Sequence, residues 1–341
     1  MPHTYMKENK LFFTDEQKKV LDLVQRRFPL EEKPYRKLGD LIGISEAEVI
    51  DHIRELKENR VIRQISAIFN TSALGYKTSL VAMKVPAEKL DEVAGVINQY
   101  PGVSHNYLRP GSYNLWFTIA VPPDQSLEEV VEILRRESCS HPTIILPAVK
   151  KYKLAMVLDV MGEENDFDDE EDEFPDITPR KYFEPTEENI RIVRCVQEDL
   201  PLDPRPFSVW ANQLGVTEDF LLEWLISKDK GGVIRRFAAV LDHRRAGFTA
   251  NGMIVWHCND EELDSLGEYL ARQPEVTHCY HRPAHPDWPY NLYAMVHGKT
   301  KEECLSIAAK LARLPSLKDY RVLFSTREFK KIRLKLFWDR S

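Results

Sequence analysis

Apolar residues recur at helical spacing in three short stretches near the start of the chain. The motifs Thr14-x-x-Gln17 and Ser45-x-x-Glu48 fit capping boxes, in which two side chains satisfy backbone N–H groups at the start of a helix. A further helix is predicted over 35–42, with Gly43 in the turn that follows. This spacing predicts a helix-turn-helix, and the β-rich run at 61–69 predicts a wing behind it.

After the wing, strand and helix patterns alternate. Alternation of apolar and polar residues predicts strands, and recurrence every three or four residues predicts helices. The predicted elements are strand 78–85, helix 88–99, strands 103–108 and 114–121, helix 127–137 and strand 143–153. This β-α-β-β-α-β order indicates a ferredoxin-like domain.

The chain contains this arrangement twice. The run Val-Ile-Arg at the start of the wing recurs 172 residues later, and His105 matches His278 at a shift of 173. The shift grows to 177 beyond an extra loop within 284–289. Two similar basic runs, 150–154 and 330–334, are aligned as the closing strands of the copies. Self-similarity at a fixed spacing is the signature of a duplicated module.

We therefore predict an α+β protein made of two tandem copies of a winged helix-turn-helix plus a ferredoxin-like domain, packed as an intrachain pseudo-dimer. In the second copy, helices are predicted from Thr186, Phe207 and Thr217, followed by a wing at 233–241. The predicted domains are winged helix-turn-helix 10–70, ferredoxin-like domain 71–158, acidic linker 159–185, winged helix-turn-helix 186–242 and ferredoxin-like domain 243–341. Further homo-oligomerisation stays open.

The formal net charge of −7 is unevenly distributed. Eleven carboxylates and no Lys or Arg fall within 159–176, so the remainder of the chain carries +4. The acidic segment lacks apolar periodicity, which predicts a linker. The mildly basic remainder suits an acidic ligand.

The cysteines and the hydropathy of the chain indicate which cellular compartment the protein occupies. Five cysteines are odd in number and show no Cys-x-x-Cys spacing, which argues against a disulfide framework or a structural zinc site. No apolar run approaches membrane-spanning length, and the first ten residues contain no signal-peptide core. We expect a cytoplasmic protein without a membrane partner.

The third helix of each copy would contact bases in a DNA-binding protein. The stretch 217–227 contains three acids and no base, and 45–56 sets four acids against Arg54 and His52. DNA affinity rests mainly on Lys and Arg neutralising phosphates, so we do not expect DNA binding. These helices are interpreted as scaffold.

The arrangement resembles the Lrp/AsnC transcription regulators, and three motifs resemble a narrower family. The run Gly-Val-Ile-Arg-Arg-Phe-Ala-Ala-Val-Leu-Asp-His-Arg-Arg-Ala-Gly-Phe at 232–248, His278-x-Tyr280-x-Arg282-Pro, and Trp-Pro-Tyr-Asn-Leu-Tyr at 288–293 are similar to siroheme decarboxylases. That family usually consists of two similar subunits, and this chain resembles both fused. The resemblance implies a carboxy-lyase of heme d1 or alternative heme biosynthesis that removes CO2 from two acetate side chains of siroheme, giving 12,18-didecarboxysiroheme. It implies no added cofactor, since iron enters with the siroheme substrate.

The residues fit this chemistry when they are considered on their own. Loss of CO2 from a pyrrole acetate leaves electron density on the remaining carbon, and an imidazolium or phenol can supply the proton near neutral pH. On an alternating strand, His278, Tyr280 and Arg282 share one face, so these three are the predicted catalytic residues. His281 is predicted to face away from them, into solvent.

A flat macrocycle with eight carboxylates needs guanidinium forks and an apolar floor. Trp288 is expected to be covered, either as a pocket wall or by the partner half, because a wet loop-tip Trp is costly. Phe237, with Trp288 and Tyr290, is predicted to form part of the floor. The predicted substrate-binding residues are Arg235, Arg236, His243, Arg244, Trp288 and Tyr290 in the second copy, and Arg63, His105, Tyr107, Arg109 and Tyr113 in the first.

The first copy departs from the pattern of the second. Gln64 stands in place of Arg236, Thr71 in place of His243, and the loop shrinks to two residues, so the second copy is predicted to hold the more complete site. Whether one or two sites operate stays open, as does ligation of the siroheme iron by a histidine. Two alternatives also stay open: an Lrp/AsnC-like regulator with a heme or amino-acid effector, and a tetrapyrrole carrier without turnover.

Overall fold

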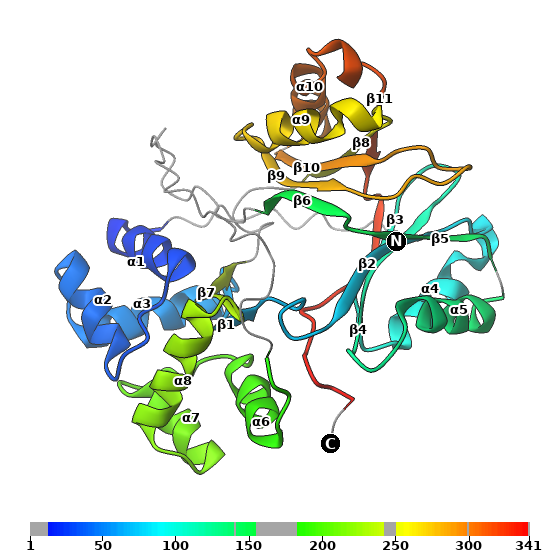
Figure 1. Ribbon diagram of the computed structural model, residues 1–341. Coiled ribbons are helices and arrows are strands. Elements are labelled where there is room, and N and C mark those ends of the chain that lie inside the picture. The colour runs from blue at the N-terminus through cyan, green and yellow to red at the C-terminus, as the bar shows by residue number, and fades with distance from the viewer. Residues whose placement is uncertain (1–12, 140, 155–182, 242–249, 299, 340–341) are drawn as a thin grey trace, which may run out of the picture. The chain divides into compact units, whose positions relative to one another are not determined.

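A computed structural model describes residues 13–139, 141–154, 183–241, 250–298 and 300–339 (Figure 1). These residues divide into two compact units. The first, called the helical unit here, comprises 13–68 and 198–241. The second, called the sheet unit, comprises 69–154, 183–197 and 250–339 apart from the gaps given above. Most of the predicted acidic linker lies outside the described residues.

The helical unit contains helix-turn-helix elements from both copies. Both predicted capping boxes are present, since Gln17 N donates to Thr14 Oγ1 (3.1 Å) and Glu48 N donates to Ser45 Oγ (3.2 Å). Gly43 ends the second helix with a left-handed φ of 80°. The elements are α1 (Asp15–Arg26), α2 (Pro34–Ile42), α3 (Glu46–Glu58), β1 (Ile62–Phe69), α7 (Pro206–Leu214), α8 (Glu218–Lys230) and β7 (Ile234–Leu241).

The two predicted wings are single strands that pair with each other. β1 and β7 form a two-stranded sheet, so each copy satisfies the strand edge of the other. Phe237 on β7 is 1% exposed, and its ring lies 5.9 Å from that of Phe28 and 5.7 Å from that of Phe207. The prediction that Phe237 belongs to a substrate floor is therefore wrong, because the side chain fills the core of the helical unit.

The sheet unit confirms the ferredoxin-like prediction in both copies. The strand orders β5-β2-β4-β3 and β11-β8-β10-β9 are those of a β-α-β-β-α-β fold, with two helices on one face of each sheet (Figure 1). The first copy contributes β2 (Lys77–Met83), α4 (Leu90–Gln99), β3 (Val103–Leu108), β4 (Leu115–Val121), α5 (Leu127–Glu137) and β5 (Thr143–Pro147). The second contributes β8 (Ala250–Trp256), α9 (Asp260–Ala271), β9 (Val276–His281), β10 (Leu292–Gly298), α10 (Lys301–Leu311) and β11 (Tyr320–Phe324).

Each sheet gains a fifth strand from the other copy. β6 (Lys150–Leu154) pairs with β9, and β12 (Arg327–Lys331) pairs with β3, both antiparallel. The prediction of a single strand over 143–153 is therefore wrong. The chain leaves one sheet after Pro147 and enters the other at Lys150, so this exchange joins the two copies by backbone hydrogen bonds.

The registers of the exchanged strands also correct the alignment of the closing runs. Lys150 lies opposite His281, and Arg327 lies opposite Leu108, the counterpart of His281 in the first copy. Lys150 therefore corresponds to Arg327, whereas sequence similarity had aligned it with Lys330. A bulge in each exchanged strand disturbs the alternation on which the sequence alignment relied.

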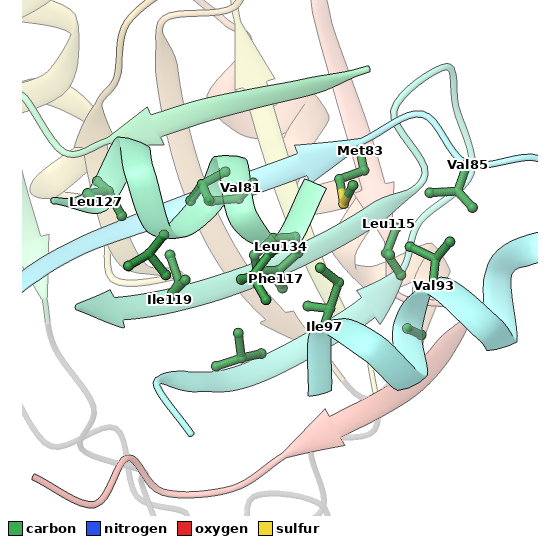
Figure 2. Close-up of a cluster of buried hydrophobic side chains, with 14 of the residues drawn as sticks. Val81, Met83, Val85, Val93, Ile97, Leu115, Phe117, Ile119, Leu127 and Leu134 are labelled. Atoms are coloured by element: carbon green, nitrogen blue, oxygen red, sulfur yellow. The ribbon is translucent and has the colours of Figure 1, made fainter. Parts of the chain in front are cut away.

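Both faces of each sheet are buried in apolar cores. Val81 and Phe117 of the first sheet pack with Val93 and Ile97 of α4 and with Leu134 of α5 (Figure 2). The residues between them on β2 and β4 point to the opposite face, where the inner sides of the two sheets share a second core. This inter-sheet core comprises Ala82, Tyr113, Trp116, Ile144, Leu146, Met253, Val255, Trp288, Tyr290, Tyr293 and Leu323. Burial on both faces explains the almost continuous apolar sequence of these strands.

Helix α6 (Glu187–Val196), predicted to open the second helix-turn-helix, is grouped with the sheet unit. Just after the helix, the side chain of Gln197 accepts from Leu336 N (2.7 Å) and donates to Leu336 O (3.3 Å). A pair of side-chain hydrogen bonds therefore ties the chain after α6 to its last described segment. No helix in the described ranges is long and apolar enough to cross a membrane.

Candidate active site

The three predicted catalytic residues lie together on the inner face of β9 or just beyond it. The His278 and Tyr280 rings lie 6.3 Å apart with planes inclined by 33°. The Arg282 guanidinium lies 4.7 Å from the centre of the Tyr280 ring and 5.6 Å from that of Tyr293 on β10. Strand alternation places all three side chains on the face away from α9. Their catalytic roles stay predictions.

His278 is oriented by its neighbour on the strand. Its Nδ1 is 2.9 Å from Thr277 Oγ1, and Thr277 Oγ1 donates to Met295 O (3.2 Å) on the adjacent strand. The hydroxyl gives its proton to that carbonyl, so the ring Nδ1–H donates to Thr277 Oγ1 in the resulting hydrogen-bond chain. The half-buried imidazole is thereby tied to the sheet backbone.

Arg282 links the two sheets. Its Nη1 donates to the carbonyl oxygen of Leu146 on β5, a strand of the first copy. Its Nε is buried and has no hydrogen-bond acceptor among the described residues. Burial lowers the pKa of Arg282, yet arginine stays charged in proteins, so the guanidinium keeps a positive charge beside Tyr280. Arg282 therefore holds the two sheets together through Nη1, while its Nε–H remains a donor without an acceptor among the described residues.

The first copy repeats the arrangement on β3. Ser104 Oγ lies 2.9 Å from His105 Nδ1, and the rings of His105 and Tyr107 lie 6.0 Å apart with planes inclined by 39°. Arg109 is 6% exposed, lies 5.7 Å above the Tyr107 ring and donates to the Leu323 carbonyl on β11 of the second copy. Burial lowers the pKa of Arg109 to about 10. The two arginines therefore make reciprocal contacts across the pseudo-dimer.

Trp288 is covered by the other copy, which was one of the two predicted outcomes. It is 2% exposed, and its ring centre lies 4.8 Å from that of Tyr290, 5.3 Å from Trp116 and 5.8 Å from Tyr113. Its Nε1 donates to Tyr293 Oη (2.8 Å). Trp288, Tyr290 and Tyr113 thus form the inter-sheet core beneath the catalytic face in this conformation, and their predicted contact with substrate stays a prediction.

The extra loop of the second copy reaches the first. His285 and Trp288 exchange backbone hydrogen bonds of 2.9 Å, which closes a tight turn. His285 Nε2 lies 3.1 Å from Ile145 O, and Asp287 pairs with Lys84 at 2.8 Å. The loop that is present only in the second copy therefore binds the edge of the first sheet through these two contacts.

The remaining predicted residues are distributed differently. Arg63 and Arg235 are exposed and Arg236 is half-buried, all three on β1 or β7 of the helical unit. His243 and Arg244 lie outside the described residues. His281 faces away from the three predicted catalytic residues, as expected, but it lies toward α9 and is half-buried, and burial lowers its pKa despite the nearby carboxylates of Asp264 and Asp260. The expected full solvation of His281 is therefore wrong.

The sequence analysis did not select two residues beside Tyr280. Tyr293 lies opposite Tyr280 on β10, donates to Tyr290 O (3.2 Å), and burial raises its pKa to about 12. Lys151 lies opposite Tyr280 on β6. Alternation counted from Trp288 and Tyr290 would put Leu292 on the inner face, but Leu292 packs under α9 and Tyr293 faces inward. No sequence signal places Lys151, because its position depends on the strand exchange.

Each unit has a surface cavity among the described residues. One, of about 340 Å³, lies in the sheet unit and is lined by residues that include Tyr76, Lys77, Thr78, Glu128 and Lys151. The other, of about 360 Å³, lies in the helical unit between Phe28 and Ile226. None of the three predicted catalytic side chains lines either cavity, but Lys151 connects the first cavity with the cross-strand position beside Tyr280.

Comparison with protein families defines the class of the chain. The model described as an AsnC-like ligand binding domain matches residues 73–153 and 245–330. The model described as a siroheme decarboxylase NirDL-like HTH domain matches residues 17–63 and 189–235. The chain is thus a tandem pair of helix-turn-helix and AsnC-like ligand-binding modules, as the repeat predicted.

Full-length relatives narrow this class to one family. The chain is 41% identical to a siroheme decarboxylase of Hydrogenobacter thermophilus over 320 residues, which cover 94% of each protein. The crystal structure of the siroheme decarboxylase NirDL matches with a TM-score of 0.76 and 36% identity over 95% of each chain. A second structure of NirDL, in complex with an iron-uroporphyrin III analogue, matches with a TM-score of 0.75 and 36% identity over 94% of each chain. This chain belongs to the siroheme decarboxylase family.

Proposed function

We propose that this chain is an enzyme that removes CO2 from the two acetate side chains of siroheme and yields 12,18-didecarboxysiroheme. The observation that carries the proposal is that His278, Tyr280 and Arg282 lie side by side in a chain that matches siroheme decarboxylases over nearly its whole length. The complex of NirDL with an iron-uroporphyrin III analogue supports a tetrapyrrole as the ligand class. The carboxy-lyase class and a cytoplasmic location are part of this proposal.

Each decarboxylation needs one broken bond and one proton. The carboxylate leaves as CO2, the electron pair of the broken C–C bond stays on the methylene carbon, and a proton converts that carbon to a methyl group. His278, tied to Thr277, is the proposed donor of this proton. Tyr280, in contact with both His278 and Arg282, orients the reacting side chain.

Binding of the substrate relies on positive side chains. Arg282 gives one N–H to Leu146 and has a buried Nε without an acceptor among the described residues, so it can donate to a substrate carboxylate as well. The predicted carboxylate contacts of Arg235, Arg236, Arg244, Arg63 and Arg109 stay predictions. Iron is supplied by the substrate, and the proposed reaction needs no added organic cofactor.

The proposal is tested by incubating the purified full chain with siroheme without oxygen and following the pigment by liquid chromatography and mass spectrometry. The wild-type protein is expected to give a pigment that has lost two CO2, and an unchanged pigment would refute the proposed function. His278→Gln is expected to lower kcat by about 100-fold or more, the usual effect of losing a general acid. His281→Gln is the matched control, because His281 lies on the same strand but faces α9. A His278→Gln enzyme as active as this control would remove His278 from the mechanism.

A further inference from the structure

The strand exchange gives the two pseudo-equivalent sites different charges. In the second copy, β6 places Lys151 opposite Tyr280. In the first copy, β12 places Glu328 opposite Tyr107. A lysine beside one tyrosine therefore corresponds to a glutamate beside the other.

The contacts of the neighbouring residues establish this correspondence independently. Lys150 pairs with Asp264 of α9 at 2.9 Å, and Arg327 donates to Asp91 of α4 (3.1 Å) at the matching place in the other copy. One residue beyond Lys151, Tyr152 packs against the core under α9, as Phe329 does against the core under α4. Lys151 and Glu328 thus occupy equivalent positions between two helix-facing residues.

Strand alternation fixes the direction of the two charged side chains. Because Lys150 and Tyr152 face α9, Lys151 between them points to the inner face, where Tyr280 also lies. Lys151 lines the cavity of about 340 Å³ together with Lys77 and Thr78, and Glu128 is the acidic residue in that lining. Two lysines therefore line one cavity, and one of them, Lys151, is the cross-strand neighbour of Tyr280.

The charges on the strand beside the other histidine are mixed. Lys331 lies opposite His105 in the same register that places Glu328 opposite Tyr107. The exchanged strand therefore brings one base and one acid to the first site. In the second site, Lys151 stands opposite Tyr280 and the uncharged residue Leu154 stands opposite His278. Only the second site receives a purely positive contribution, which is what a substrate with eight carboxylates favours.

We propose that Lys151 binds a carboxylate side chain of the substrate next to Tyr280, and that Glu328 keeps the polyanionic substrate away from the equivalent position next to Tyr107. The chain then has one working site, on the His278 side, although the motif occurs twice. This inference rests on the proposed function. Both Lys151 and Glu328 are exposed, so the contribution of each charge decreases as salt rises.

The test compares Lys151→Gln and Glu328→Gln in the full chain, using siroheme turnover and an absorption titration of siroheme binding. Lys151→Gln is expected to raise KM and the dissociation constant by about 10-fold at low ionic strength, as for loss of a hydrogen bond to a charged group, with kcat nearly unchanged. The effect should shrink in high salt, and Lys151→Arg should restore most of the affinity. Glu328→Gln is expected to leave KM at the His278 site within about twofold, because that charge is remote from the bound ligand, and to let a second siroheme bind to each chain in the titration.

Lys150→Gln is the matched control, since Lys150 is adjacent on β6 but faces Asp264. Thermal melts of each variant separate unfolding from loss of binding. An unchanged KM in folded Lys151→Gln would overturn the assignment of Lys151. Two siroheme molecules bound per wild-type chain, or only one bound per Glu328→Gln chain, would overturn the proposed role of Glu328. Failure of the wild-type protein to release CO2 would instead refute the proposed function, and the binding titration would still report on Lys151.

Discussion

Replacing Trp288 by alanine tests whether this side chain stabilises the inter-sheet core or instead forms a surface that contacts the substrate. The ring is 2% exposed and contacts three other aromatic rings, two of them from the first copy. Truncation of a buried Trp to alanine costs about 3–5 kcal/mol, and each lost aromatic pair contributes about 0.5–1 kcal/mol beyond burial. The hydrogen bond from Nε1 to Tyr293 adds about 1 kcal/mol. Since these contributions overlap, we expect Trp288→Ala to lower the free energy of unfolding of the sheet unit by about 4–5 kcal/mol.

Trp288→Phe is the matched variant. It keeps an aromatic ring but loses the N–H that donates to Tyr293, so a smaller loss of about 1–2 kcal/mol is expected. Urea denaturation followed by far-UV circular dichroism measures both losses, and because the chain has two compact units, two transitions are fitted wherever they appear. If Trp288→Ala unfolded within about 1 kcal/mol of the wild-type protein while its KM for siroheme rose, the core assignment would be refuted.

Two further predictions concern the attachment of the exchanged strand β6 to α9. Gly267→Ala is expected to destabilise the sheet unit by about 1–3 kcal/mol in the same urea assay, because a Cβ at this position would lie 2.3 Å from the Tyr152 ring. An unchanged midpoint of urea unfolding would show that the Tyr152 ring moves aside at no cost. Hydrogen bonds from Tyr152 and Lys150 lower the pKa of the Asp264 carboxyl in the folded protein. The ionised carboxylate therefore stabilises the fold fully above the pKa of about 4 that it has in the unfolded chain, and this stabilisation is lost as the pH falls through its lower pKa in the folded protein. Wild type should therefore lose more stability than Asp264→Asn between about pH 6 and pH 3, and equal losses would contradict this linkage.

Much of the fold follows from local sequence signals. The caps at Thr14 and Ser45 work through contacts three residues apart, so their motifs predicted both helix starts. Strand alternation likewise placed Tyr280 and Arg282 on one face, since that relation depends only on the backbone of β9. The duplication was visible for the same reason, because each copy repeats its own local pattern.

The parts that the sequence did not predict depend on contacts between distant segments. Nothing in the run Lys-Lys-Tyr-Lys-Leu at 150–154 shows that this strand leaves its own sheet, because either sheet edge offers the same backbone groups. Phe237 was assigned with Trp288 and Tyr290 to the substrate floor, yet its ring packs against residues of both copies. Burial of such a side chain is decided by the partner surface, which a single sequence does not display.

The exchange of strands also sets an order of events during synthesis. Thr326, which leads into β12, donates its N–H to Leu108 at the end of β3, a residue 218 positions earlier in the chain. The first sheet therefore leaves the ribosome with its β3 edge unpaired, and that edge is covered only after β12 has been synthesised. Because such long-range closure is slow and an open edge invites pairing with other chains, the first half has to persist as an unfinished sheet until β12 has emerged.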